Sequence, residues 1–280
     1  MSGDPRPADL AGRIEQVNEA TGRLLAGFDG LSEDAAAAPS LCPGWTVGHV
    51  LTHIARNADG LRRGAEGARR GEAVPMYDSA EARDQDIEAG AGRPVAELVA
   101  DVISSAAALS DAWSAMRPAD WDREMLHHRF GTLPLSDTPM MRLGEVEIHH
   151  VDLGGRFRPD GWPDSFVAGI LSAADDLPAR LPDGLALQVR ATDTGERWSA
   201  GAAGRADAEA GAAGSLGGGA TGGADSGTGT GTAAGADATR SVVVAGPSWA
   251  IAAWLVGRPG PVADALSVTG GGLPPLKPWG

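Results

Sequence analysis

Apolar residues recur at helical spacing in four stretches of the first 155 residues of this 280-residue chain. Because residues three and four positions apart share one face of a helix, each stretch predicts an amphipathic helix. Thr46 is a candidate N-cap for the second helix, and Pro94 stands at the first turn of the third. The stretches are 8–28, 46–63, 94–116 and 139–154. Four such helices joined by loops predict a four-helix bundle over residues 1–155.

The pattern changes after residue 155, where shorter elements alternate. These elements predict a small α+β domain over residues 156–280, so that the whole chain is a two-domain α+β protein. Residues 201–239 are rich in Gly and Ala and nearly free of large apolar side chains, which predicts a flexible insertion. Helices are expected at 163–177 and 247–258, and strands within 185–201 (two strands and a turn), 240–246 and 265–271.

Composition narrows the functional classes. The formal net charge is −14 at pH 7, which argues against a nucleic-acid-binding protein. One cysteine, Cys42, excludes an intramolecular disulfide framework and a four-cysteine zinc site. The first residues lack the basic and apolar regions of a signal peptide, and no apolar run approaches the roughly 20 residues that span a bilayer. We therefore expect a cytoplasmic, monomeric protein with no nucleic-acid or membrane partner.

The fourth predicted helix carries an unusual density of ligand-type side chains. Glu145 and His149 lie one turn apart on one face, with Asp152 three residues further along the same face. The alternative pair, Glu147 and His150, points away from it. Apolar residues surround this helix on most sides, which predicts a buried helix, and a buried carboxylate is costly unless it meets a cation or a metal. An ordinary intrahelical Glu–His pair is the alternative to a metal site.

A third metal ligand has to come from another helix. The second helix carries His49 and His53 one turn apart, and His53 is favoured because it borders the apolar stripe. Three ligands of the His, Glu and His type leave a fourth position open, as in catalytic zinc sites. His127 and His128 are expected at the surface, in a loop or hairpin. Cys42, with no obvious base nearby, is interpreted as a packing residue, and so are Trp45 and Tyr77.

Several segments together resemble the mycothiol-dependent maleylpyruvate isomerases. The resemblance implies a DinB-like four-helix bundle followed by a small, sterol-carrier-like α+β domain; the Gly/Ala-rich insertion is unusual for that family. It also implies zinc, or another divalent metal, bound by His53, Glu145 and His149, with mycothiol as cosubstrate. The segments are PGWTVGHVLTHIARNADGL (43–61), PMYDSAEARDQDIEAG (75–90), GEVEIHHVDLG (144–154), WAIAAWLVGR (249–258) and the terminal LPPLKPWG.

The implied reaction converts maleylpyruvate to fumarylpyruvate by thiolate addition, bond rotation and elimination. Arg83 and Arg258 are the expected catalytic cations for a small dicarboxylate substrate, with Arg142 as a further candidate. A surface pair with Asp86 is the alternative for Arg83, and a cation at a helix C-terminus is the alternative for Arg258. Two other functions stay open: a mycothiol S-transferase acting on electrophiles, and a non-catalytic metal-binding regulatory protein.

Overall fold

The computed structural model describes residues 7–201 and 240–277. The chain divides into two compact units, the first ending at Gly161 and the second beginning at Trp162. The predicted insertion at 201–239 lies outside the described residues except for Gly201. Within the part that is described, none of the helices combines the length and the apolar composition needed to cross a membrane.

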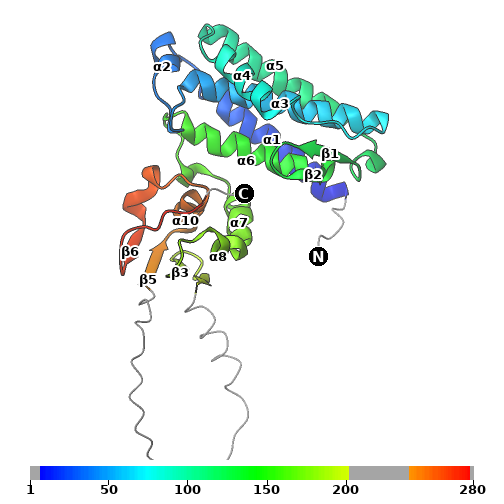
Figure 1. Cartoon of the computed structure of the whole chain (residues 1–280). Coiled ribbons are helices and arrows are strands. Elements are labelled where there is room, and N and C mark those ends of the chain that lie inside the picture. Colours follow the sequence, from blue (N-terminus) through cyan, green and yellow to red (C-terminus); the bar gives the residue numbers. More distant parts are fainter. Residues whose placement is uncertain (1–6, 202–239, 278–280) are drawn as a thin grey trace, which may run out of the picture. The chain divides into compact units, whose positions relative to one another are not determined.

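The first unit is built on the four predicted helices (Figure 1). Two short helices join them, and α4 was not predicted because it buries only Ile87 and Gly90 and so carries no apolar stripe. Pro94 is the N-cap of α5 rather than its first helical residue. The bounds are α1 Pro7–Ala26, α2 Glu33–Ala37, α3 Val47–Arg70, α4 Ala80–Ala91, α5 Val95–Ser114 and α6 Thr138–Asp152.

Helix α3 lies at the centre of this unit and packs against α4, α5 and α6, while α1 packs against α6 and α5. Leu51, Ile54 and Leu61 of α3 are fully buried. Burying a side chain of this kind contributes about 1.5–3 kcal/mol. The helix continues seven residues past the predicted end because its later buried positions are small residues, which give little apolar signal; Gly64, for example, lies against Met125.

Between α5 and α6 the chain forms a hairpin of β1 (Glu124–His127) and β2 (Gly131–Pro134). Short 3-10 turns flank it, η1 (Pro118–Asp120) and η2 (Leu135–Asp137). The start of α3 is fixed by a capping box: Thr46 caps the backbone N–H of His49, and the His49 ring accepts from the N–H of Thr46. His49 is thereby engaged at the helix terminus.

The second unit holds a four-stranded sheet in the order β4–β3–β5–β6. Strands β3 and β5 are parallel, and the two outer pairings are antiparallel. Helix α10, apolar on nearly every side, packs on α7 and on the two central strands. All the elements expected for this domain are present. Their bounds are α7 Asp164–Ser172, α8 Leu177–Arg180, β3 Leu185–Ala191, β4 Arg197–Ala200, β5 Arg240–Gly246, α10 Ser248–Leu255 and β6 Ser267–Thr269.

Candidate metal centre

Two histidines and a carboxylate from α3 and α6 meet inside the bundle. His53 Nε2 lies 2.8 Å from Glu145 Oε2, and His149 Nε2 lies 3.2 Å from the same oxygen. The two imidazole rings stand edge to face with centroids 4.7 Å apart. One nitrogen from each ring and one carboxylate oxygen therefore point at a common centre.

Helical spacing explains the selection of these residues on α6. Glu145 and His149 are four residues apart and share the face toward α3, while Glu147 faces α1, where it pairs with Arg23 at 2.5 Å. His150 stacks on Phe157 with the ring planes 6° apart. The alternative Glu–His pair considered from the sequence therefore serves packing and ion pairing.

Burial and mutual contacts determine the protonation states of the three side chains. Burial lowers the pKa of His53 to about 4, although Glu145 opposes this, so His53 is neutral near pH 7. Burial acts to raise the pKa of Glu145, but His53 and His149 outweigh it and hold that pKa well below its usual range. For His149 burial acts to lower the pKa, but hydrogen bonds with Asp152, Cys42 and Glu145 raise it well above normal. His149 carries the proton that a bound cation would replace.

The donor set fits a divalent metal such as zinc. Bonds of about 2.0–2.1 Å in a tetrahedral zinc site set neighbouring ligand atoms about 3.3 Å apart, close to the 2.8 and 3.2 Å seen here. Asp152, fully buried, accepts from His149 Nδ1 at 2.8 Å, which turns the Nε2 lone pair toward the centre. Three protein ligands leave a coordination position for a further molecule.

Cys42 brings a second group of possible metal ligands to the other side of the same ring. Its sulfur lies 3.1 Å from Asp152 Oδ2 and 3.9 Å from His149 Nδ1. The expectation that Cys42 has no base nearby is wrong, because a backbone hydrogen bond from the Leu41 N–H to the Asp152 carbonyl brings this loop to the end of α6. The group of His53, Glu145 and His149 is favoured as the metal site, because Asp152 already accepts the Nδ1 proton of His149.

Arg83 on α4 contacts His53 at Nδ1, the ring nitrogen that does not face Glu145. Its Nη2 donates to His53 Nδ1 at 3.2 Å, and its Nη1 pairs with Asp84 at 2.6 Å. Arg83 therefore pairs with Asp84 and not with Asp86, the partner considered in the sequence analysis. The Arg83 guanidinium also lies 5.9 Å from the centre of the Tyr77 ring.

His127 differs from its interpretation in the sequence, and Tyr77 and Arg142 show features that the sequence did not predict. His127, expected at the surface, is only 8% exposed, and its Nδ1 accepts from the backbone N–H groups of Arg129 and Phe130. Tyr77 packs edge to face with His128, but its hydroxyl is buried without a hydrogen-bond partner. Arg142 is 1% exposed. No periodic pattern marks His127 on β1 or Tyr77 in the segment before α4, whereas Arg142 lies three residues before Glu145 on α6.

Arg258, the second predicted cation, belongs to the second unit and follows α10. Its backbone N–H donates to the Ala253 carbonyl at 2.8 Å, and its Nη1 donates to the Val256 carbonyl at 3.0 Å. These contacts are those of a cation at a helix C-terminus. Its catalytic role stays a prediction.

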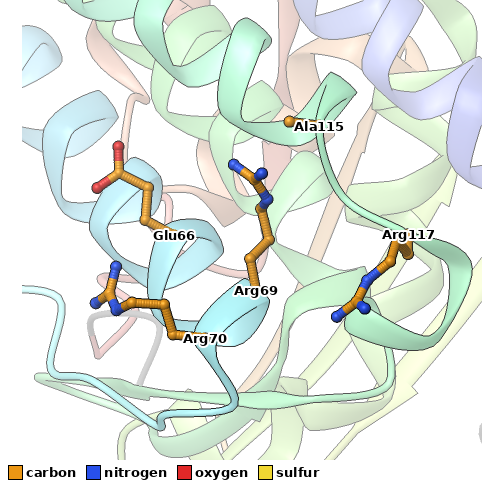
Figure 2. A pocket seen from close by; sticks show the side chains of 5 residues that line it. All are labelled: Glu66, Arg69, Arg70, Ala115 and Arg117. Carbon is orange, nitrogen blue, oxygen red and sulfur yellow. The ribbon is translucent and has the colours of Figure 1, made fainter.

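An open hollow of about 560 Å³ lies elsewhere on the bundle, where α3 and α5 end (Figure 2). Arg69 and Arg70 stand in the last turn of α3, where cations complement the helix dipole. None of the three converging donors lines this hollow. It is lined by Glu66, Arg69, Arg70, Ala115 and Arg117.

Comparison with known proteins points to the same part of the chain. The family described as "Mycothiol maleylpyruvate isomerase N-terminal domain" matches residues 17–154, which include all three donors. The crystal structure of the mycothiol-dependent maleylpyruvate isomerase is similar with a TM-score of 0.75 and 26% sequence identity, over 96% of this chain and 97% of that one. A mutant of that enzyme, with alanine in place of a histidine, is similar with a TM-score of 0.74, 26% identity and the same coverage.

No curated protein sequence matches the chain. The matched residues 17–154 comprise α3, α4, α5 and α6, which supply every side chain of the candidate centre. Residues 17–154 therefore belong to the mycothiol maleylpyruvate isomerase N-terminal domain family.

Proposed function

We propose that this protein is a metal- and mycothiol-dependent isomerase that converts maleylpyruvate to fumarylpyruvate. The proposal is carried by one observation: His53, Glu145 and His149 direct three donor atoms at one centre, within the segment that matches the family. In addition, the crystal structure of a mycothiol-dependent maleylpyruvate isomerase is similar to this chain over nearly the whole length of both proteins.

A divalent ion at this centre would lower the pKa of the mycothiol sulfhydryl and so supply a thiolate at neutral pH. The chain's own residues then orient and neutralise the substrate. Asp152 keeps His149 in the tautomer that presents Nε2, and the walls of the bundle restrict water.

Arg83 is suited to hold a substrate carboxylate. A neutral His53 that presents its Nε2 lone pair to an ion carries its proton on Nδ1, which then no longer accepts from Arg83. Arg83 Nη2 thus becomes available to another acceptor, beside the unpartnered Nε, while Nη1 stays paired with Asp84. A planar guanidinium can bind a carboxylate through two parallel hydrogen bonds. The side chain is 18% exposed, so a small molecule can reach it.

The reaction itself is a balanced addition and elimination. The thiolate sulfur bonds to one alkene carbon, and the electron pair of the double bond moves onto the conjugated carbonyl oxygen. The remaining single bond rotates. The pair then returns, the carbon–sulfur bond breaks, and the trans product leaves with the thiolate regenerated. No oxidant or reductant is consumed, and cationic donors beside the carbonyl and carboxylates lower the barrier.

The test is an ultraviolet assay of maleylpyruvate loss by the zinc-loaded full chain, with and without mycothiol. We expect turnover only with the thiol, abolished in His53→Ala and retained in His49→Ala, a matched histidine one turn away on α3. Consumption of the thiol by an alkylating electrophile without isomerisation would point to an S-transferase instead. Zinc binding with neither reaction would point to a regulatory protein.

A further inference from the structure

Three polar atoms around the centre are buried and make no hydrogen bond: Tyr77 Oη, Arg83 Nε and Arg142 Nη2. A buried donor without a partner costs about 1–3 kcal/mol, and more when it is charged. These three donors lie around one centre, where a bound molecule with several acceptor atoms could satisfy them together.

Arg142 carries the strongest part of this argument. Its Nη1 donates to the Ile54 carbonyl and to Asn57 Oδ1, both at 2.8 Å and both neutral acceptors. Within the described residues, no carboxylate lies at ion-pair distance from its guanidinium. Because a fully buried cation is costly without a counter-charge, its other end is expected to face an anion.

Helical spacing sets this guanidinium next to the metal centre. Arg142 precedes Glu145 by three residues on α6, and its partner Asn57 follows His53 by four residues on α3. The contact between Arg142 and Asn57 therefore lies one turn along both helices from the contact between Glu145 and His53.

Tyr77 and Arg83 complete the same neighbourhood. The pKa of Tyr77 is raised to about 12, mainly by burial and then by Glu145, with Arg83 and Arg142 acting in the opposite direction. All these groups are therefore within electrostatic range of its hydroxyl, and the phenol keeps its proton at neutral pH. The Tyr77 ring is held between the Arg83 guanidinium and the His128 ring.

We propose that Arg142 Nη2, Tyr77 Oη and the Arg83 guanidinium form a carboxylate-binding subsite beside the metal centre. It takes one carboxylate of a small dianionic substrate, and this deepens the proposed function and rests on it. The two guanidinium groups can only donate, and the protonated Tyr77 hydroxyl adds a further donor, so the subsite selects an anion over a neutral electrophile. Tyr77 thereby acquires a specificity role that its position in the sequence does not reveal, and Arg142 becomes the anion contact for which the sequence made it a candidate.

The test uses the zinc-loaded full chain and maleate, a stable cis-dicarboxylate, with binding followed by isothermal titration calorimetry. Tyr77→Phe removes one hydroxyl, and Arg142→Lys keeps a charge but removes the planar group. A hydrogen bond to a charged group contributes about 1.5–3 kcal/mol, so each change is expected to weaken maleate binding by about 10- to 100-fold. The control is Arg56→Met, an arginine of α3 that pairs with Asp59 and Asp101 instead.

Unchanged zinc content and unchanged maleate affinity in Tyr77→Phe and Arg142→Lys would overturn the subsite, as would failure of the wild type to bind maleate. If Arg142 only ties α6 to α3, Arg142→Lys lowers thermal stability and leaves maleate affinity as it was. Mycothiol-dependent turnover of maleylpyruvate is measured separately. If the wild type turns over maleylpyruvate but the variants bind maleate as tightly as the wild type, only the subsite proposal fails. If the variants bind maleate more weakly but the wild type does not turn over maleylpyruvate, only the isomerase proposal fails.

Discussion

Two glutamates on α6, only two positions apart, are expected to differ in their effect on zinc binding when each is mutated. Glu145 lies in the candidate centre, whereas Glu147 faces α1 and pairs with Arg23. Glu147→Gln removes the charge of that pair and keeps one oxygen acceptor. We expect it to lower the free energy of unfolding and to leave metal binding as it was.

The burial of the two partners sets the magnitude. The Glu147 side chain is 1% exposed and that of Arg23 is 36% exposed. Breaking a fully buried pair costs about 3–5 kcal/mol, but a cation that is one-third exposed recovers much of its hydration. Burial also raises the pKa of Glu147 while Arg23 opposes it, so the ionised form carries a desolvation cost that glutamine avoids. The expected net loss is about 1–2 kcal/mol.

The assay combines urea unfolding of the metal-free protein, followed by helical circular dichroism, with zinc titration against a competing chelator. Glu145→Gln is the matched comparison. It should weaken zinc binding at least about 100-fold, since loss of groups that only orient ligands already costs 10- to 100-fold. Because Glu145 contacts His53 and His149 in the metal-free protein, Glu145→Gln should also lower the free energy of unfolding, and zinc affinity is the measurement that separates the two variants. Equal loss of zinc affinity in the two variants, or no loss of stability in Glu147→Gln, would refute the assignment of faces on α6.

Three other changes have defined outcomes. The pKa of His149 is raised, so this residue still holds a proton that zinc must displace on binding. Zinc affinity should therefore rise about tenfold per pH unit from pH 6 to 8, and a chelator competition that shows no change with pH would contradict this. His127 has its pKa lowered to about 4, mainly by burial, so stability should fall as pH drops from about 6.5 to 4; His127→Gln should remove that part of the pH dependence in urea unfolding. Asp193 accepts the Ser248 N–H at 3.0 Å and caps α10, so Asp193→Ala should cost about 0.5–2 kcal/mol in thermal unfolding. Asp183→Ala, on the exposed turn before β3, should be neutral.

The sequence contained enough information for the long helices and for the geometry of the three donors. Stripes of large apolar residues mark α1, α3, α5 and α6, and the spacing of Glu145 and His149 follows from helical periodicity alone. The border position of His53 on its stripe was a weaker signal. It was informative because α3 and α6 pack directly on each other.

Other parts of the centre depend on loops, whose course no local pattern gives. Cys42 meets Asp152 because the loop before α3 bonds to the end of α6, 110 residues away in sequence. His127 is buried because its hairpin packs on α3, where Gly64 leaves room for Met125. Tyr77 lies beside Arg83 and Glu145 although nothing in its neighbourhood in the sequence marks it as more than a packing residue.

Zinc-edge X-ray absorption of the zinc-loaded protein without mycothiol tests the central claim most directly. Nitrogen and oxygen ligands lie about 2.0–2.2 Å from zinc and a cysteine sulfur about 2.3 Å, so the spectrum separates the group of His53, Glu145 and His149 from the group that contains Cys42. We expect a shell of nitrogen and oxygen with the scattering of two imidazoles, lost in His53→Ala. A sulfur at about 2.3 Å, or a spectrum unchanged in His53→Ala, would contradict the account.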